Sequence, residues 1–119
     1  RIGLERMADC LFCNLFQGKI PTTVLYRDDD CFVINDINPV APTHLLVIPI
    51  KHMTYIEPFS DEEFKVITSM FKVARNFAIS EGISDSGYRL TINQKEDAGQ
   101  QVPHLHLHLI GGDNLSGIG

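Results

Sequence analysis

The chain has 119 residues, of which 44% are hydrophobic and 21% charged, enough apolar material for the core of one domain. Its formal charge of −5 at pH 7, with no block of basic residues, argues against a surface built to hold DNA or RNA. Three cysteines, an odd number, with no apolar leader and no apolar run of about twenty residues, predict a reduced cytoplasmic protein without a membrane span.

The numbering begins with a segment that is left out of the predicted fold. We interpret residues 1–6, which precede Met7, as a cloning remnant or an N-terminal extension, and residues 7–119 as a single domain. The apolar segment over residues 10–18 predicts a short helix that ends before Pro21.

Three strands are predicted in the next part of the chain. Residues 22–36 form two of them, with the acidic cluster at residues 28–30 as a solvated turn, because Asp favours turns and is depleted in strands. Residues 37–43 contain two prolines and predict a stiff loop. Residues 44–50 are rich in leucine and β-branched side chains, which indicates a central strand.

One long helix is predicted between residues 60 and 82. Ser60 is its N-cap, Glu63 completes a capping box three residues later, and Gly82 is its stop signal. Apolar residues at spacings of three and four predict that one helix face packs on a sheet as core, and these are Phe64, Ile67, Phe71, Ala74 and Ala78.

The C-terminal part completes a sheet. Residues 87–93 predict a strand, residues 94–101 a polar loop, and residues 102–112 the last strand. About five strands and one long helix, joined by hairpin-length connections, predict an α+β fold with a mainly antiparallel five-stranded sheet.

The last strand carries the clearest chemical signal. His104, His106 and His108 alternate with leucines, so the three imidazoles are expected to share one strand face while the leucines enter the core. One metal ion is not expected to bind all three, because positions i and i+4 are separated by roughly 13 Å, whereas a zinc–nitrogen bond is about 2 Å. A neutral imidazole can instead attack phosphorus, and the middle histidine suits that role best. Ordinary half-exposed strand histidines are the alternative.

A second motif lies near the N-terminus. Cys10 and Cys13 form a C-x-x-C motif, whose spacing lets two thiolates hold one ion. A redox pair is the alternative, although the βαβ setting that a thioredoxin-like protein needs after the motif is absent. Cys31 stands apart in a predicted strand and is expected to be a small buried hydrophobe.

The alternating histidines at the end of the chain resemble the signature of the histidine triad (HIT) family of nucleotide hydrolases and transferases. The resemblance covers residues 10–112 and is carried by residues 20–52, 87–93 and 98–112. The chain is most similar to the nucleoside phosphoramidate hydrolase branch. The resemblance implies a HIT-like fold, a homodimer and a small nucleotide as substrate.

The resemblance also implies catalytic roles for the histidines. His106 matches the nucleophile, which would form a covalent nucleotidyl-histidine, and His108 matches a histidine that contacts phosphate oxygens and the leaving group. His44 matches a fourth histidine of the same site. His104, the first triad histidine, is counted with this catalytic group as well.

Further positions match the residues with which the family binds nucleotides. Asp36 is expected to accept hydrogen bonds from ribose hydroxyls, and Gln101 stands where the branch usually carries a serine near the leaving group. Backbone N–H groups near Gly99 are expected to bind the phosphate. The remaining positions, polar near the phosphate and apolar around the nucleobase, are Asn93, Gln100, Leu11, Phe12, Leu15, Ile34 and Ile37.

His52 and His104 both match histidines that zinc-bearing members of the family carry. The resemblance therefore implies a closed structural zinc site of Cys10, Cys13, His52 and His104, and no organic cofactor is expected.

The implied activity is hydrolysis of a purine nucleoside 5′-phosphoramidate, or of an acyl-adenylate, at the α-phosphate. Three alternatives remain open at this point. They are a dinucleoside polyphosphate hydrolase, a catalytically weak nucleotide-binding scaffold protein, and a metal-dependent hydrolase.

Overall fold

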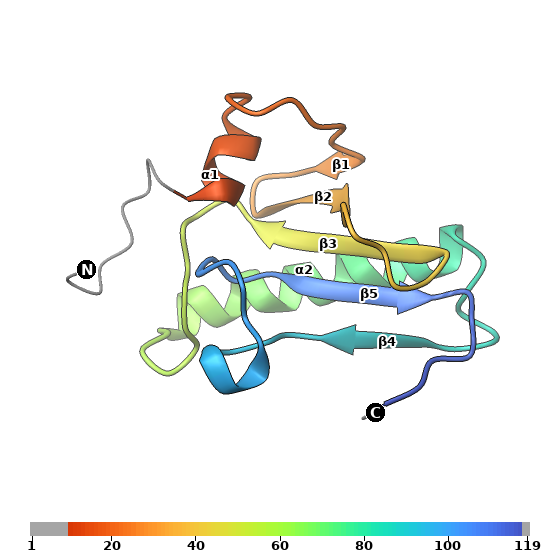
Figure 1. Ribbon diagram of the computed structural model, residues 1–119. Coiled ribbons are helices and arrows are strands. Elements are labelled where there is room, and N and C mark those ends of the chain that lie inside the picture. Colours follow the sequence, from red (N-terminus) through yellow and green to blue (C-terminus); the bar gives the residue numbers. More distant parts are fainter. Residues whose placement is uncertain (1–9, 118–119) are drawn as a thin grey trace.

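A five-stranded antiparallel sheet organises the protein, as the computed structural model of residues 10–117 shows (Figure 1). The strand order is β1-β2-β3-β5-β4, so the last strand of the chain lies between two earlier ones. The elements are α1 Leu11–Phe16, β1 Tyr26–Arg27, β2 Cys31–Asn35, β3 Thr43–Pro49, α2 Asp61–Ser80, β4 Tyr88–Thr91, the 3-10 helix η2 Glu96–Ala98 and β5 Leu107–Gly111. The predicted α+β class, the antiparallel sheet and both helices are confirmed.

The position of β5 beside β3 determines which histidines meet. In this antiparallel pair His44 lies opposite Ile110, and Leu46 lies opposite His108. Every residue of β3 is buried, as expected for the predicted central strand. Two segments more than sixty residues apart in sequence therefore place their histidines side by side near one end of the sheet.

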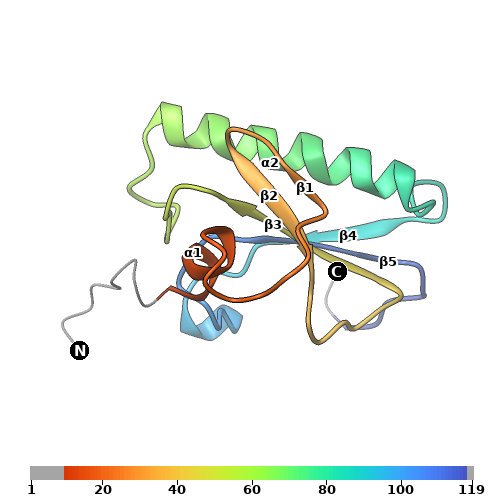
Figure 2. The same ribbon diagram turned by 90° about the horizontal axis from the view of Figure 1, so that it is seen from above.

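The sheet is covered differently on its two faces, with α2 across one and α1 on the other (Figure 2). Alternate residues of the central strands face opposite layers, because side chains of a strand point to the two faces in turn. The core beneath α2 includes Val33, Val47, Leu105, Leu107, Leu109, Met70 and Ala74. The core beneath α1 includes Phe32, Ile34, Leu46, Ile48 and Phe12.

Helix α2 begins and ends as predicted. Ser60 accepts a hydrogen bond from the Glu63 backbone N–H, and the Glu63 carboxylate accepts one from the Ser60 backbone N–H, which completes the capping box. The chain leaves the helix through Gly82, whose φ of 76° lies in the left-handed region that favours glycine.

The predicted apolar stripe of α2 is wrong at two positions. Phe64 is 43% exposed and Phe71 is 40% exposed, whereas Met70 and Val73 are buried in the core. The apolar arc of the helix is wider than the sheet can cover, because Met70 and Val73 add a second side to the stripe read from the sequence. The sheet contacts the middle of that arc, which leaves both phenylalanines at its edge.

The predicted hairpin turn is confirmed. Asp28 Oδ1 accepts hydrogen bonds from the backbone N–H groups of Asp30 and Cys31, which closes the turn between β1 and β2. Cys31 is fully buried, and burial raises the pKa of its thiol to about 12. This cysteine is therefore an inert core residue, as expected.

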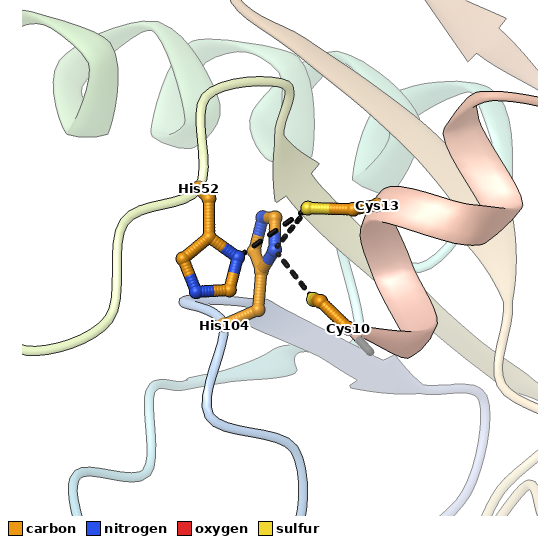
Figure 3. Close-up of side chains that lie close together, drawn as sticks. All are labelled: Cys10, Cys13, His52 and His104. Carbon is orange, nitrogen blue, oxygen red and sulfur yellow. Dashed lines mark hydrogen bonds between the residues drawn. The ribbon is translucent and has the colours of Figure 1, made fainter. Parts of the chain in front are cut away.

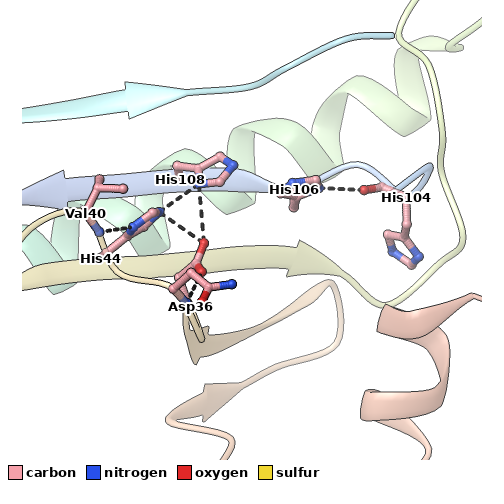
Figure 4. Close-up of polar contacts among 7 residues, drawn as sticks. Asp36, Val40, His44, His104, His106 and His108 are labelled. Atoms are coloured by element: carbon pink, nitrogen blue, oxygen red, sulfur yellow. Dashed lines mark hydrogen bonds and ion pairs between the residues drawn. The ribbon is translucent and has the colours of Figure 1, made fainter. Parts of the chain in front are cut away.

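The triad histidines alternate with leucines that are buried in the core beneath α2, as expected, but only His108 lies within a strand. Strand β5 begins only at Leu107, so His104 and His106 lie in the segment that leads into it. Pro103 has no N–H, and the chain bends there with a hydrogen bond from the His104 N–H to the Val102 carbonyl. The His104 ring is directed toward α1, where Cys10 lies (Figure 4).

Residues 1–6, interpreted as a cloning remnant or an N-terminal extension, lie outside the described residues. Among the residues that are described, neither helix combines the length and the apolar character that crossing a membrane would require.

Candidate active site

A cavity of about 520 Å³ opens between α1, the end of β2 and the loop that follows η2. We call it the histidine cavity, because His106 and His108 form part of its wall. The other predicted site residues that line it are Leu11, Phe12, Leu15, Ile34, Asp36, Ile37, Asn93, Gly99 and Gln101. Its lining thus combines an apolar side with a polar side, which is typical of sites for small ligands.

The hydrogen bonds of His106 fix which ring nitrogen carries the hydrogen. Nδ1 lies 2.8 Å from the backbone carbonyl oxygen of His104, and a carbonyl can only accept, so Nδ1 is the donor (Figure 4). The ring is buried, 7% exposed, and burial lowers its pKa. His106 is therefore held neutral near pH 7, with the lone pair of Nε2 unprotonated.

The ring of Phe12 supports this orientation. It packs edge-on against His106 at 5.0 Å and against His104 at 5.7 Å between ring centroids. Phe12 belongs to α1, so the short N-terminal helix forms one wall beside His106.

A second group of polar side chains surrounds His108. His44 Nε2 lies 2.9 Å from His108 Nδ1 and 3.2 Å from Asp36 Oδ2. His44 Nδ1 accepts a hydrogen bond from the Val40 backbone N–H at 3.1 Å (Figure 4). Burial, together with the neighbouring His106 and His44, lowers the pKa of His108 to about 4, while Asp36 acts in the opposite direction.

Three of the residues predicted for catalysis or nucleotide binding do not line the histidine cavity. His44 lies behind His108, and His104 points toward the cysteines of α1. The Gln100 amide is used within its own loop, where it accepts from the Lys95 backbone N–H and donates to the Val102 carbonyl. The Gln100 side chain therefore shapes the loop beside the cavity.

Several lining residues were not predicted from the sequence. They are Ile20, Pro21, Thr22, Asn35, Asn38, Leu46 and Val102. Most lie in loops, or at strand ends, where no local pattern indicates that a side chain faces a cavity. Leu46 lies in a largely apolar strand, so the sequence did not indicate that its side chain faces the cavity. Its position opposite His108 makes it a neighbour of the site.

Four side chains, Cys10, Cys13, His52 and His104, gather at the other end of the triad segment, and we call them the Cys/His cluster (Figure 3). Cys10 Sγ lies 3.2 Å from His104 Nδ1, and Cys13 Sγ lies 3.3 Å from His52 Nδ1. All four ligand atoms lie within 4.8 Å of one another. The cluster joins α1 to the segments that follow β3 and precede β5.

The donor set of the Cys/His cluster fits a metal ion. His104 Nε2 lies 2.8 Å from the Pro49 carbonyl and must donate to it, which leaves Nδ1 with a lone pair directed at the cysteines. Metal-binding histidines commonly donate their second N–H to a carbonyl in this way. Cys10, Cys13 and His104 are buried, so a bound ion would be shielded from water.

Comparison with known proteins identifies the family. The sequence profile of the HIT domain matches residues 17–115. The chain belongs to the HIT family. It is 38% identical over 107 residues, 90% of each chain, to the purine nucleoside phosphoramidase of Escherichia coli strain K12.

Solved structures of HIT proteins are similar to this chain over most of its length. A HIT family hydrolase from Legionella pneumophila Philadelphia 1 shares 43% identity with a TM-score of 0.85, over 90% of this chain and 96% of its own. A histidine triad protein from Clostridium difficile shares 39% identity with a TM-score of 0.87, over 98% of this chain and 100% of its own.

A second potential metal-binding group of this HIT domain is explained better by hydrogen bonding. Asp36, His44 and His108 offer ligand atoms within 4.8 Å of one another. An ion on Nε2 of His44 would require the ring hydrogen to move to Nδ1, where it would oppose the hydrogen of the Val40 amide. The group is therefore described better as hydrogen-bonded side chains beside the histidine cavity.

Proposed function

We propose that this protein hydrolyses purine nucleoside 5′-phosphoramidates, or the related acyl-adenylates, at the α-phosphate through a covalent intermediate on His106. The protein is a histidine triad nucleotide hydrolase. The observation that carries the mechanism is the bond from His106 Nδ1 to the His104 carbonyl at 2.8 Å. That bond leaves Nε2 of a cavity-lining imidazole as an unprotonated nucleophile.

The reaction then has two steps. Nε2 of His106 attacks the α-phosphorus, the bond from phosphorus to the leaving nitrogen breaks, and the nitrogen departs as the amine with a proton taken from water, held by a hydrogen bond from the Nε2–H of His108. Water next attacks phosphorus, the bond to His106 breaks, and the proton released by water passes to the solvent. The products are a nucleoside monophosphate and the free amine.

The histidine cavity supplies the binding groups for such a substrate. The carboxylate of Asp36 accepts hydrogen bonds from the ribose hydroxyls, and the apolar side around Phe12 and Ile34 holds the nucleobase. Backbone N–H groups beside Gly99 and the side chains of Asn93 and Gln101 surround the phosphate. This arrangement binds an anion without a basic patch, in keeping with a net charge of −5.

The Cys/His cluster is proposed to hold a structural zinc ion. Tetrahedral zinc with ordinary bond lengths places sulfur and nitrogen ligands about 3.5 Å apart. The cysteine–histidine distances of 3.2, 3.3 and 3.6 Å agree with that separation. Four protein ligands leave no open position, so the ion would stabilise the attachment of α1 and take no part in the reaction.

We further propose that residues 7–119 form one domain, and that the protein is a cytoplasmic homodimer. Strand β4 forms an edge of the sheet and exposes Tyr88 and Leu90, which suits pairing with a second copy. The expected mass of a dimer can be checked by light scattering. A monomer at micromolar concentration would contradict this part of the proposal.

The activity is tested by comparing an adenosine 5′-phosphoramidate with a diadenosine polyphosphate as substrates. We expect faster turnover of the phosphoramidate and a mass increase of one nucleotidyl group on His106 in a rapidly quenched reaction. The His106→Gly variant should bind nucleoside monophosphate but lose turnover by at least about 10³-fold. Ile79→Ala, on the exposed side of α2, is the matched control and should keep full activity.

Three results would overturn parts of this proposal. Preference for the diadenosine compound would refute the substrate class. Full activity of His106→Gly would refute the nucleophile. Nucleotide binding without any turnover would make the protein a scaffold.

A further inference from the structure

A continuous set of hydrogen bonds runs from the loop before β3 to the histidine cavity. It starts at the backbone N–H of Val40, passes through the ring of His44 and ends on His108 and Asp36 (Figure 4). We call this set the histidine relay. It is buried at its centre, where His44 is only 6% exposed, so water does not compete for its bonds.

The Val40 amide fixes the hydrogen of His44. A backbone N–H can only donate, so Nδ1 of His44, 3.1 Å away, must present its lone pair. A neutral imidazole carries one hydrogen, which therefore sits on Nε2. The backbone of the loop thus makes His44 a permanent donor toward the cavity side.

That single hydrogen has two competing acceptors. His108 Nδ1 lies 2.9 Å from His44 Nε2, and Asp36 Oδ2 lies 3.2 Å from the same atom. One N–H cannot form two well-directed bonds at full strength. A hydrogen shared with Asp36 leaves Nδ1 of His108 only partly bonded, so the hydrogen of His108 is not fixed on Nε2.

A bound nucleotide changes this competition. Asp36 Oδ1 already accepts from the Asn38 backbone N–H at 2.8 Å, and Oδ2 is the oxygen that faces His44. Ribose hydroxyls that donate to Asp36 draw electron density from the carboxylate and weaken it as an acceptor for His44, so the His44 hydrogen shifts toward His108.

We infer that the ribose hydroxyls of the substrate, by engaging Asp36, direct the His44 hydrogen to His108 and so fix the His108 hydrogen on Nε2, where the leaving group needs a donor. His44 is then a positioning residue that links recognition of the sugar to departure of the leaving group. The inference rests on the proposed function and adds a specificity rule. Substrates without ribose hydroxyls lose reaction rate as well as affinity.

The test compares adenosine 5′-phosphoramidate with its 2′,3′-dideoxy analogue at saturating concentrations in a single turnover. Amine release reports the first step, in which His108 acts. For the unmodified protein we expect the dideoxy analogue to react about tenfold more slowly, a part of the roughly 10²- to 10⁴-fold that a positioned proton donor contributes.

Two variants of His44 separate positioning from a purely structural role. The amide nitrogen of His44→Gln reaches about as far as Nε2 and has two hydrogens, so it can serve Asp36 and His108 together. We expect the two substrates to react at equal rates with this variant. The shorter His44→Asn can accept from Val40 but does not reach His108, so we expect a slow reaction with both substrates.

The loop backbone is tested in the same way. Val40→Pro deletes the amide hydrogen, and Val40→Ala keeps it at a side chain that is 68% exposed. We expect the tenfold substrate preference to disappear only with proline. If the proline variant does not fold, the two His44 variants still decide the question.

A readout independent of turnover is the ¹⁵N NMR signal of His108. Adding adenosine 5′-monophosphate should shift this ring toward the form with hydrogen on Nε2, and the dideoxy nucleotide should shift it less. Equal first-step rates and equal shifts for the two sugars would overturn the inference while leaving the proposed function intact. Absence of any turnover of the ribose substrate would overturn both.

Discussion

Replacing Gly111 with alanine should test how tightly the end of β5 is packed. Gly111 is the last residue of β5 and pairs with Thr43 of β3 and Tyr88 of β4. A Cβ at this position would lie 2.6 Å from Cδ1 of Ile83 and 3.3 Å from its Cβ. Carbon atoms normally approach to about 3.5–4.0 Å, so the side chain of Ile83 would have to move.

The expected cost follows from that geometry. Ile83 is 4% exposed, and Tyr88 Cβ also lies 3.3 Å from the new atom, so the neighbours have little room to retreat. Overpacking of a well-packed core costs about 1–3 kcal/mol of unfolding free energy. For a domain of this size we expect the melting temperature to fall by about 4–12 °C.

The assay is urea denaturation of a double-mutant cycle. Ile83→Val removes Cδ1, the closest atom, and by itself costs about 0.5–1.5 kcal/mol. We expect the double variant Gly111→Ala with Ile83→Val to be more stable than the sum of the single effects predicts, by about 1 kcal/mol. Strict additivity of the two changes, or a Gly111→Ala protein as stable as the parent, would refute the reasoning.

Three further predictions concern pH, metal and the long helix. Burial lowers the pKa of His108 from 6.5 to about 4, so its contribution to stability is complete above pH 6.5 and declines as the pH falls toward 4. Denaturation at pH 7 and 4.5 should show a loss of roughly 2–3 kcal/mol from this group, and a His108→Asn variant that lost as much would contradict the assignment. Chelation, or Cys13→Ser, should lower the melting temperature before it affects turnover at temperatures where the protein stays folded, whereas loss of turnover with an unchanged melting curve would indicate a catalytic metal. Ser60→Ala should destabilise the protein by about 1 kcal/mol in thermal unfolding because it breaks the capping box, while Ser69→Ala, in the middle of α2, should change stability by less than about 0.5 kcal/mol; equal effects would argue against a special role of the cap.

Part of the site was predictable because its signals are local. Leu105, Leu107 and Leu109 are fully buried, as the alternation with histidine predicted. Most positions assigned through the resemblance to the HIT family line one cavity. Gln100 is an exception, since its amide satisfies two backbone groups of its own loop and is not free to turn toward the cavity.

The amino-acid sequence by itself determined the elements whose causes lie within a few residues of one another. The capping box of α2 and the Asp28 turn are examples, because each depends on a side chain bonding to backbone nearby. The C-x-x-C motif is another example, because Cys10 and Cys13 are three residues apart and so lie within one turn at the start of α1.

Only the tertiary structure decided which distant groups meet and which way they face. The pairing of β5 with β3 brings His44 to His108, and the bend at Pro103 sends His104 to the cysteines. The loop before β3 sets the hydrogen on His44 through a backbone amide that no side-chain pattern reveals. Such contacts depend on the packing of whole layers around the sheet, and that packing is a property of the complete chain.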